Sequence, residues 1–188
     1  FLARVLRTLR KRCGCQIAEV AGGSKRNAIP REAEAVVALP ECGFDRAEQL
    51  VADLEEELGE EYRGIEEGFS ISLRESGEKA SVMDFETSSL LIDFLSVLPH
   101  GVVKMSGVIP GLVETSVNLA LLSMEDEGVK VILSCRSPLG SAREAMGGRL
   151  KAISNLVGCR FSRGGSYPGW MPNTDSELLK KMEKIYSD

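Results

Sequence analysis

The sequence predicts an α+β fold made of two tandem αββαβ units, with antiparallel sheets covered by helices on one face. Two observations carry this prediction. Apolar residues recur at helical spacing in some segments and alternate with polar residues in others, and the order of these segments repeats along the chain. Such units are ferredoxin-like, and placing their sheets edge to edge would bury strand edges that are a liability when exposed.

The first unit is expected over residues 1–82. Its opening helix has an apolar stripe and a basic opposite side. Its second helix is amphipathic and strongly acidic on the exposed side, and three segments alternate as half-buried strands. The elements are expected at residues 1–12, 15–21, 31–39, 44–58 and 69–73.

The second unit is expected over residues 83–165, with the same order of elements. A hairpin turn at Glu125–Gly128 joins two of its strands. The remaining residues, 166–188, contain an aromatic turn and a final helix capped by Thr174 or Asp175, which has no place in either unit. The elements of the second unit are expected at residues 88–98, 113–124, 129–136, 141–157 and 159–163.

Composition restricts the classes of function. The chain has 188 residues with 43% hydrophobic and 27% charged residues, an ordinary globular balance that can bury a core. Its net charge of −5 makes it a poor general nucleic-acid binder, and no apolar stretch is long enough to span a membrane. The basic side of the first helix lacks interleaved aromatic residues, so a solvated helix face is favoured over a nucleic-acid or membrane surface. We expect no nucleic acid and no membrane as partners.

The cysteines indicate a reducing compartment. The chain has an odd number of cysteines, with no Cys-x-x-Cys pair: Cys13, Cys15, Cys42, Cys135 and Cys159. Its first residues do not form a secretory apolar segment. Free thiols in the cytoplasm are therefore expected. Because the first residue already lies within a helical pattern, we also expect the chain to be a piece of a longer protein.

The chain has one histidine, His100, in a predicted loop between Pro99 and Gly101. A catalytic zinc site takes at least three protein ligands, commonly His with a carboxylate, so a His-rich metal centre within this chain is excluded. The signatures of phosphate loops, dinucleotide-binding loops, zinc-binding helices and nucleophile elbows are absent. We therefore assign no catalytic residue and no metal ligand to this chain, and expect His100 to be an exposed loop residue.

Three polar residues are candidates for binding a small molecule. Asn27 lies in a loop, where its amide suits a bound group or simply shapes its own turn. Arg136 ends a strand on the face away from the apolar stripe of Val131 and Leu133, where a guanidinium suits a carboxylate or a surface ion pair. The face occupied by Asn118 depends on a strand register that the sequence leaves uncertain by one residue.

Around these residues the sequence resembles the bacterial aminoacyl-histidine (Xaa-His, β-Ala-His) dipeptidases, which are dinuclear-zinc metallopeptidases. Four stretches that occur in the same order cover nearly all of the chain, and together they are specific. They are Gly-Gly at 22–23 with Asn-Ala-Ile-Pro-Arg-Glu-Ala at 27–33, Gly-Leu-Val-Glu-Thr-Ser-Val-Asn-Leu at 111–119, Arg-Ser at 136–137, and Tyr-Pro-Gly-Trp at 167–170 with Pro-Asn at 172–173 and Asp-Ser at 175–176.

The resemblance implies that residues 1–165 are a lid inserted into a catalytic domain and that residues 166–188 begin the return into that domain. The family's zinc ligands, its general-base glutamate and the lid histidine that stabilises the oxyanion lie outside this span. Two zinc ions are therefore implied for the parent enzyme and none for this chain, which alone is expected to be inactive.

The resemblance also implies a composite site, with Asn27 near the scissile carbonyl and Arg136 on the terminal carboxylate of the substrate. Relatives with a single-unit lid form dimers in which both subunits supply such residues. Here the first unit has Pro40 where the family places the arginine, and the second unit supplies Arg136. The two units are thus expected to mimic a dimer, so oligomerisation is possible but not required.

Taken together, these features predict the lid fragment of a cytoplasmic zinc dipeptidase that cleaves Xaa-His-type dipeptides with a metal-activated water. The lid would meet the dipeptide through the catalytic domain of the parent, positioning it and excluding water. The alternative is a stand-alone binding or assembly module with tandem ferredoxin-like repeats and no catalysis.

Overall fold

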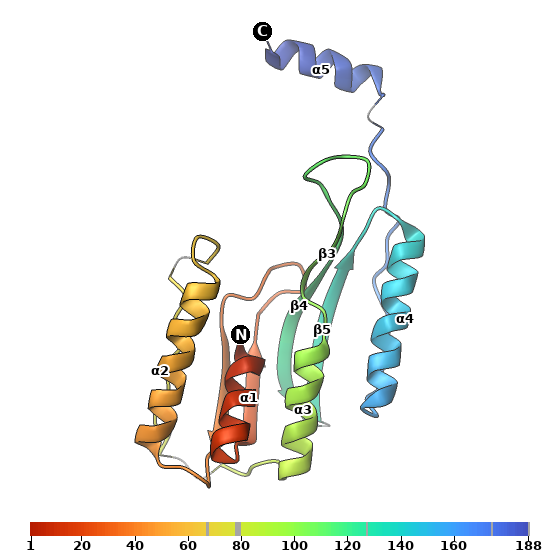
Figure 1. Cartoon of the computed structure of the whole chain (residues 1–188). Helices are drawn as coiled ribbons and strands as arrows, with labels where there is room; N and C mark the ends of the chain where they lie inside the picture. The colour runs from red at the N-terminus through yellow and green to blue at the C-terminus, as the bar shows by residue number, and fades with distance from the viewer. Residues whose placement is uncertain (67, 78–79, 127, 174, 188) are drawn as a thin grey trace.

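Two groups of strands, each flanked by helices, form one antiparallel sheet in the computed structural model (Figure 1). The structure describes residues 1–66, 68–77, 80–126, 128–173 and 175–187. In chain order, the elements are α1 (Leu2–Cys13), β1 (Gln16–Gly22), β2 (Ala33–Ala38), α2 (Phe44–Glu61), α3 (Phe85–Val97), β3 (Gly101–Met105), β4 (Val113–Glu125), β5 (Gly128–Arg136), α4 (Gly140–Leu156) and α5 (Glu177–Ser187). The α+β class predicted from the sequence is confirmed.

The strands of the two predicted units are joined edge to edge. β1 pairs with β2, and β4 pairs with both β3 and β5, always antiparallel. The two groups meet where Gly22 of β1 pairs with Leu122 of β4. The pairing of Glu125 with Gly128 confirms the predicted hairpin turn, of which Glu127 lies outside the described residues. The junction gives β1 and β4 strand partners on both sides, so these central edges are protected.

Helices α2, α1, α3 and α4 lie in a row over one face of the sheet, with α1 and α3 adjacent at its centre (Figure 1). The apolar stripes of these helices and the strands beneath them enclose the core, whose burial is the main stabilising contribution to the fold. Its largest fully buried apolar side chains are Leu6, Ile17, Leu58, Ile92, Val20, Val117, Cys13 and Cys15.

The basic side of α1 is partly neutralised by its neighbours. Arg4 pairs with Glu61 of α2 at 2.6 Å and with Glu57 at 3.5 Å. On the other flank, Arg10 pairs with Asp93 of α3 at 2.9 Å. These contacts support the interpretation of α1 as a packed helix with a solvated charged side.

The third strand predicted for the first unit, residues 69–73, is not a strand. Phe69, Ile71 and Leu73 are half-buried against the core, as their alternation indicated. The backbone, however, bonds to a helix and not to the sheet. The N–H of Ile71 donates to the carboxylate of Glu55 on α2 at 2.9 Å. The segment therefore packs beside a helix and does not extend the sheet.

The predicted last strand of the second unit, residues 159–163, is also wrong. The N–H of Cys159 donates to the carbonyl oxygen of Ser154, and the chain then turns back along α4. Arg163 reaches Glu144 of that helix with its two terminal nitrogens at 2.8 and 3.0 Å. As in the first unit, polar groups of a helix bind a segment that the sequence pattern assigned to the sheet.

β3 was not predicted, because its sequence is apolar without alternation. It is an edge strand that pairs with the first half of β4, from Gly101 against Val117 to Met105 against Val113. Most of its side chains are exposed, including Val102 and Met105. The second unit therefore contains one strand that the first unit lacks.

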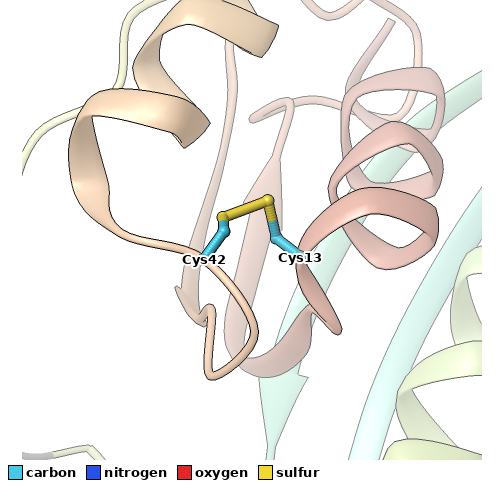
Figure 2. The surroundings of a disulfide bond; sticks show 2 residues. All are labelled: Cys13 and Cys42. Carbon is cyan, nitrogen blue, oxygen red and sulfur yellow. A yellow bond between two sulfur atoms is a disulfide. The ribbon is translucent and has the colours of Figure 1, made fainter.

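The expectation that all five cysteines are free thiols is wrong for two of them. Cys13 and Cys42 form a disulfide that joins the end of α1 to the loop before α2 (Figure 2). The backbone brings these segments together, because the N–H of Glu41 donates to the carbonyl oxygen of Cys13 at 3.2 Å. Cys15, Cys135 and Cys159 are free, as expected.

The final helix, α5, lies away from the rest of the molecule (Figure 1). A cap at Asp175 would start the helix at residue 176, but α5 begins at Glu177. The carbonyl oxygen of Ser176 accepts the first helical hydrogen bond, from Lys180 at 3.1 Å, so Ser176 occupies the capping position. The other predicted cap, Thr174, lies outside the described residues. Among the described helices, none combines the length and apolar character needed to cross a membrane.

Candidate functional site

The loop between β1 and β2 is held against β4 by a close backbone contact. Gly23 has φ +69°, and a Cβ atom there would lie 2.1 Å from the carbonyl oxygen of Ala120. Only glycine fits such an approach in this backbone conformation. The N–H of Gly23 donates to the carbonyl oxygen of Glu32, which closes the base of the loop. The residues of the loop, including Asn27, therefore project over the end of the second strand group.

Asn118 contacts that loop directly. Its side-chain Nδ2 donates to the carbonyl oxygen of Ala28 at 2.7 Å, which fixes the orientation of the amide. Asn118 pairs with Ser134 of β5, which settles the register that the sequence left open. Its Oδ1 atom is buried and has no hydrogen-bond partner among the described residues. The amide thus has one acceptor left over for a further donor.

Arg136 ends β5 on the same face of the sheet as Asn118. Val131 and Leu133 pack on the core beneath the helices, so the alternation places Arg136 on the opposite, open face, as predicted. Its guanidinium donates to the carbonyl oxygen of Asn27 at 3.5 Å, the outer limit of a hydrogen bond. Within the described ranges, no carboxylate pairs with Arg136. Most of its donors are therefore available to a ligand.

The backbone beyond Arg136 is held firmly. The buried Ser137 hydroxyl accepts a hydrogen bond from Thr115 Oγ1 of β4 at 3.0 Å. The carbonyl oxygen of Ser137 accepts a second from Arg143 of α4 at 2.7 Å. A Cβ atom on Gly169 would lie 2.7 Å from that same oxygen, so the segment after α4 also packs against this turn. These contacts reduce the freedom of the strand end that carries the guanidinium.

His100 lies beside this cluster and is exposed, as predicted, although nothing in the sequence indicated a role for it there. Its Nδ1 accepts a hydrogen bond from the backbone N–H of Leu119, the residue after Asn118, at 3.1 Å. Loss of hydration lowers the pKa of His100. The imidazole is therefore neutral near pH 7, with its hydrogen on Nε2. Only the strand register, which sequence alone does not provide, connects His100 with Asn118.

The chemistry available to this cluster is binding and orientation. An unpaired guanidinium and two side-chain amides suit a carboxylate and neighbouring peptide groups. The free thiols are poor nucleophiles. Burial raises the pKa of Cys15 to about 11, and partial loss of hydration also raises the pKa values of Cys135 and the exposed Cys159. In the part of the chain that the structure describes, no three His, Cys, Asp or Glu residues form a potential metal site.

Three comparisons relate this chain to known proteins. Residues 1–66 match the M20 family model described as a peptidase dimerisation domain. The cytosol non-specific dipeptidase of Escherichia coli (strain K12) is 30% identical over 165 residues, which are 88% of this chain and 34% of that protein. The crystal structure of aminoacylhistidine dipeptidase from Vibrio alginolyticus matches with a TM-score of 0.86 at 33% identity, over 99% of this chain and 38% of that one. The chain thus spans little more than a third of the length of these relatives.

Proposed function

We propose that this chain is the substrate-positioning lid of a zinc dipeptidase that cleaves Xaa-His-type dipeptides. The match of residues 1–66 to the peptidase dimerisation domain of the M20 family supports this proposal. The names of both relatives describe dipeptidases, and one of them names a substrate with a histidine residue. The name of the Escherichia coli protein also supports the cytoplasm as the place of action. The sequence motifs and the arrangement of the site residues support the lid role.

The observation that carries the proposal is the convergence of residues from both predicted units. The loop of the first unit supplies Asn27, and the second unit supplies Asn118 and Arg136, which contact that loop. In this proposal Arg136 binds the terminal carboxylate of the dipeptide, and Asn27 lies near the scissile carbonyl. Asn118 holds the loop in place through the carbonyl oxygen of Ala28.

Zinc ions do not fit the donor set of this chain. A zinc site needs at least three protein ligands at one point, and the described residues bring no such group together. The two zinc ions of the proposed parent would therefore be bound by residues outside this chain. We assign no step to the metal here and expect the chain alone to be inactive.

The decisive experiment replaces Arg136 in the parent enzyme. Charge-assisted hydrogen bonds contribute about 1.5–3 kcal/mol each, so Arg136→Ala should lower kcat/KM for a dipeptide by at least about tenfold. Arg136→Lys should recover only part of this loss, because an ammonium group cannot make the planar two-point contact. Arg7→Ala, which removes an exposed arginine of α1 away from the site, is the matched control and should leave kcat/KM unchanged.

The substrate can be changed instead of the enzyme. A dipeptide with an amidated carboxyl end should be cleaved much more slowly by the wild-type enzyme, and the difference should nearly vanish in Arg136→Ala. If the wild type cleaves the amidated dipeptide equally well, Arg136 does not bind the carboxylate and the proposed role is wrong.

The match to a dimerisation domain favours a second role, self-association, which the two-unit architecture does not require. β2 and β5 each pair with one neighbour among the described strands, so each offers an edge to another copy. Light scattering of the purified chain over a concentration series distinguishes a monomer from a dimer. If the mass stays that of a monomer at all concentrations, the two units of one chain would take the place of the two subunits of a dimer.

A further inference from the structure

The line along which the two strand groups meet is incompletely paired. We call this line the seam and define it by Ile17 and Gly22 of β1 and Leu119 and Leu122 of β4. Strand pairing crosses the seam at Gly22 and Leu122. The register of β4 is irregular between Leu119 and Leu121. Backbone groups on either side of this crossing therefore need other hydrogen-bond partners.

Two side chains supply those partners. On β1, the buried hydroxyl of Ser88 accepts a hydrogen bond from the N–H of Ile17 at 3.0 Å. On β4, Nδ1 of His100 accepts one from the N–H of Leu119 at 3.1 Å. Each contact satisfies a backbone N–H on one side of the seam. Of the two acceptors, only the imidazole changes its protonation state near neutral pH.

We propose that His100 is a positioning residue that acts as a pH-sensitive latch of the seam and holds Asn118 against the loop that carries Asn27. A neutral imidazole offers Nδ1 as an acceptor when its hydrogen is on Nε2. An imidazolium has hydrogens on both nitrogens, so Nδ1–H would face the N–H of Leu119. Two donors cannot form a hydrogen bond, and protonation therefore opens the latch.

The surroundings of His100 favour the closed latch at neutral pH. Loss of hydration lowers its pKa. The charged side chains of the adjoining strands, Lys104 and Glu114, pair with each other at 2.9 Å. Because the closed state disfavours the extra proton, the latch is fully effective above the ordinary histidine pKa of about 6.5. Its contribution is lost as the pH falls through the lowered pKa of the closed state.

The position of Leu119 in the chain connects the latch to the site. Leu119 follows Asn118, whose Nδ2 holds the carbonyl oxygen of Ala28. Release of the Leu119 N–H loosens β4 at the start of its irregular stretch, directly beside Asn118, which anchors the loop. The consequence for a dipeptide rests on the proposed function, whereas the latch itself is a property of this chain and is tested without a substrate.

The test is amide exchange of the complete, isotopically labelled chain, followed by NMR between pH 5.5 and 7.5. With an open-state pKa of about 6.5, protection of the Leu119 amide, corrected for the intrinsic exchange rate, should fall by up to about tenfold from the upper to the lower pH. The side-chain amide signal of Asn118 should shift with the same midpoint. In His100→Asn, the side-chain oxygen replaces Nδ1 as an acceptor that does not titrate, so both responses should disappear while protection remains.

Ser88→Ala is the matched control, because it removes the seam contact that does not titrate. It should lower protection of the Ile17 amide equally at all pH values and leave the pH response of Leu119 in place. A wild-type Leu119 protection that stays constant with pH, or a pH response that persists in His100→Asn, would overturn the latch. A response of Leu119 without any shift of Asn118 would refute the positioning role alone. Failure of the Arg136 experiment would leave all of these outcomes unchanged.

Discussion

The two predicted units bury their second helices to different depths. In the first unit, α2 places Ala47, Val51, Leu54 and Leu58 in the core. In the second, Met146 is the one large apolar side chain of α4 that is buried among the described residues. The second helix of the first unit thus buries more apolar side chains than that of the second unit. The second unit has more and longer strands.

This difference matches the division of polar residues between the units. The first unit contributes a disulfide and the loop with Asn27, and it has Pro40 where the family places an arginine. The second contributes Asn118, Arg136 and the titratable contact of His100. We infer that the first unit contributes more to stability, and that most side chains of the candidate site lie in the second. Matched substitutions in the two units should therefore differ in their effects on stability.

Leucines on the two second helices provide the strongest test. Leu58 of α2 is fully buried, whereas Leu156 at the end of α4 is 87% exposed. Leu58→Ala should lower the free energy of unfolding by about 2–5 kcal/mol, through lost apolar burial and a residual cavity. Leu156→Ala should change it by about 0.5 kcal/mol or less. Urea unfolding of both variants measures this difference, and similar losses would contradict the contrast.

The disulfide should have the next largest effect. Cys13 and Cys42 are 29 positions apart, and closing a loop of that size contributes about 3–4 kcal/mol in the chain-entropy account. Cys42→Ala should therefore lower the free energy of unfolding by about 2–4 kcal/mol, and a reducing agent should lower that of the wild type by a similar amount. In a reducing cytoplasm the first unit would lack this contribution.

The control for the disulfide is Cys159→Ala, which removes an exposed free thiol and should have almost no effect. If the reducing agent leaves the urea midpoint of the wild type unchanged while Cys42→Ala shifts it, packing of the Cys42 side chain would account for the loss. The first unit would then not depend on the covalent link.

Alternation in the sequence predicted which side of a strand a side chain occupies better than it predicted the hydrogen-bond partners of the backbone. It placed Arg136 on the open face and Phe69, Ile71 and Leu73 toward the core, because a period of two residues fixes which side a side chain occupies. It could not show that the Ile71 N–H would bind Glu55, since a distant carboxylate competes with a strand edge only in three dimensions.

The same limit applies to contacts that depend on register. The pairing of Cys13 with Cys42 and the contact of His100 with Leu119 join segments whose approach is set by tertiary packing. Residue spacing carries no information on either contact. Polarity and strand alternation, in contrast, singled out Asn27 and Arg136, for which motif resemblance then implied roles, and left the face of Asn118 open. The fold brings these three residues together.

The smallest expected effect concerns the starts of two helices, one from each unit. Asp84 caps α3 by accepting a hydrogen bond from the N–H of Thr87 at 2.7 Å, whereas α2 begins at Gly43 with no side-chain cap. This bond from the Thr87 N–H lowers the pKa of Asp84. Folding therefore favours the ionised form, and the contribution is complete above the ordinary aspartate pKa of about 3.9 and is lost as the pH falls through the lowered value.

Asp84→Ala should consequently lower the Tm by less than loss of the disulfide does, and only at pH values where Asp84 is ionised. Asp84→Asn keeps an acceptor without a charge, so it should retain most of the stability and lose the pH dependence.

In α2 the opposite change is available, because a Cβ atom on Gly43 meets nothing within 4 Å and its backbone is extended. Gly43→Ser should raise the free energy of unfolding by a few tenths of a kcal/mol. Thermal unfolding between pH 3 and 7 measures both helices, and an equal pH response in Asp84→Ala and the wild type would show that the Asp84 carboxylate does not stabilise the start of α3.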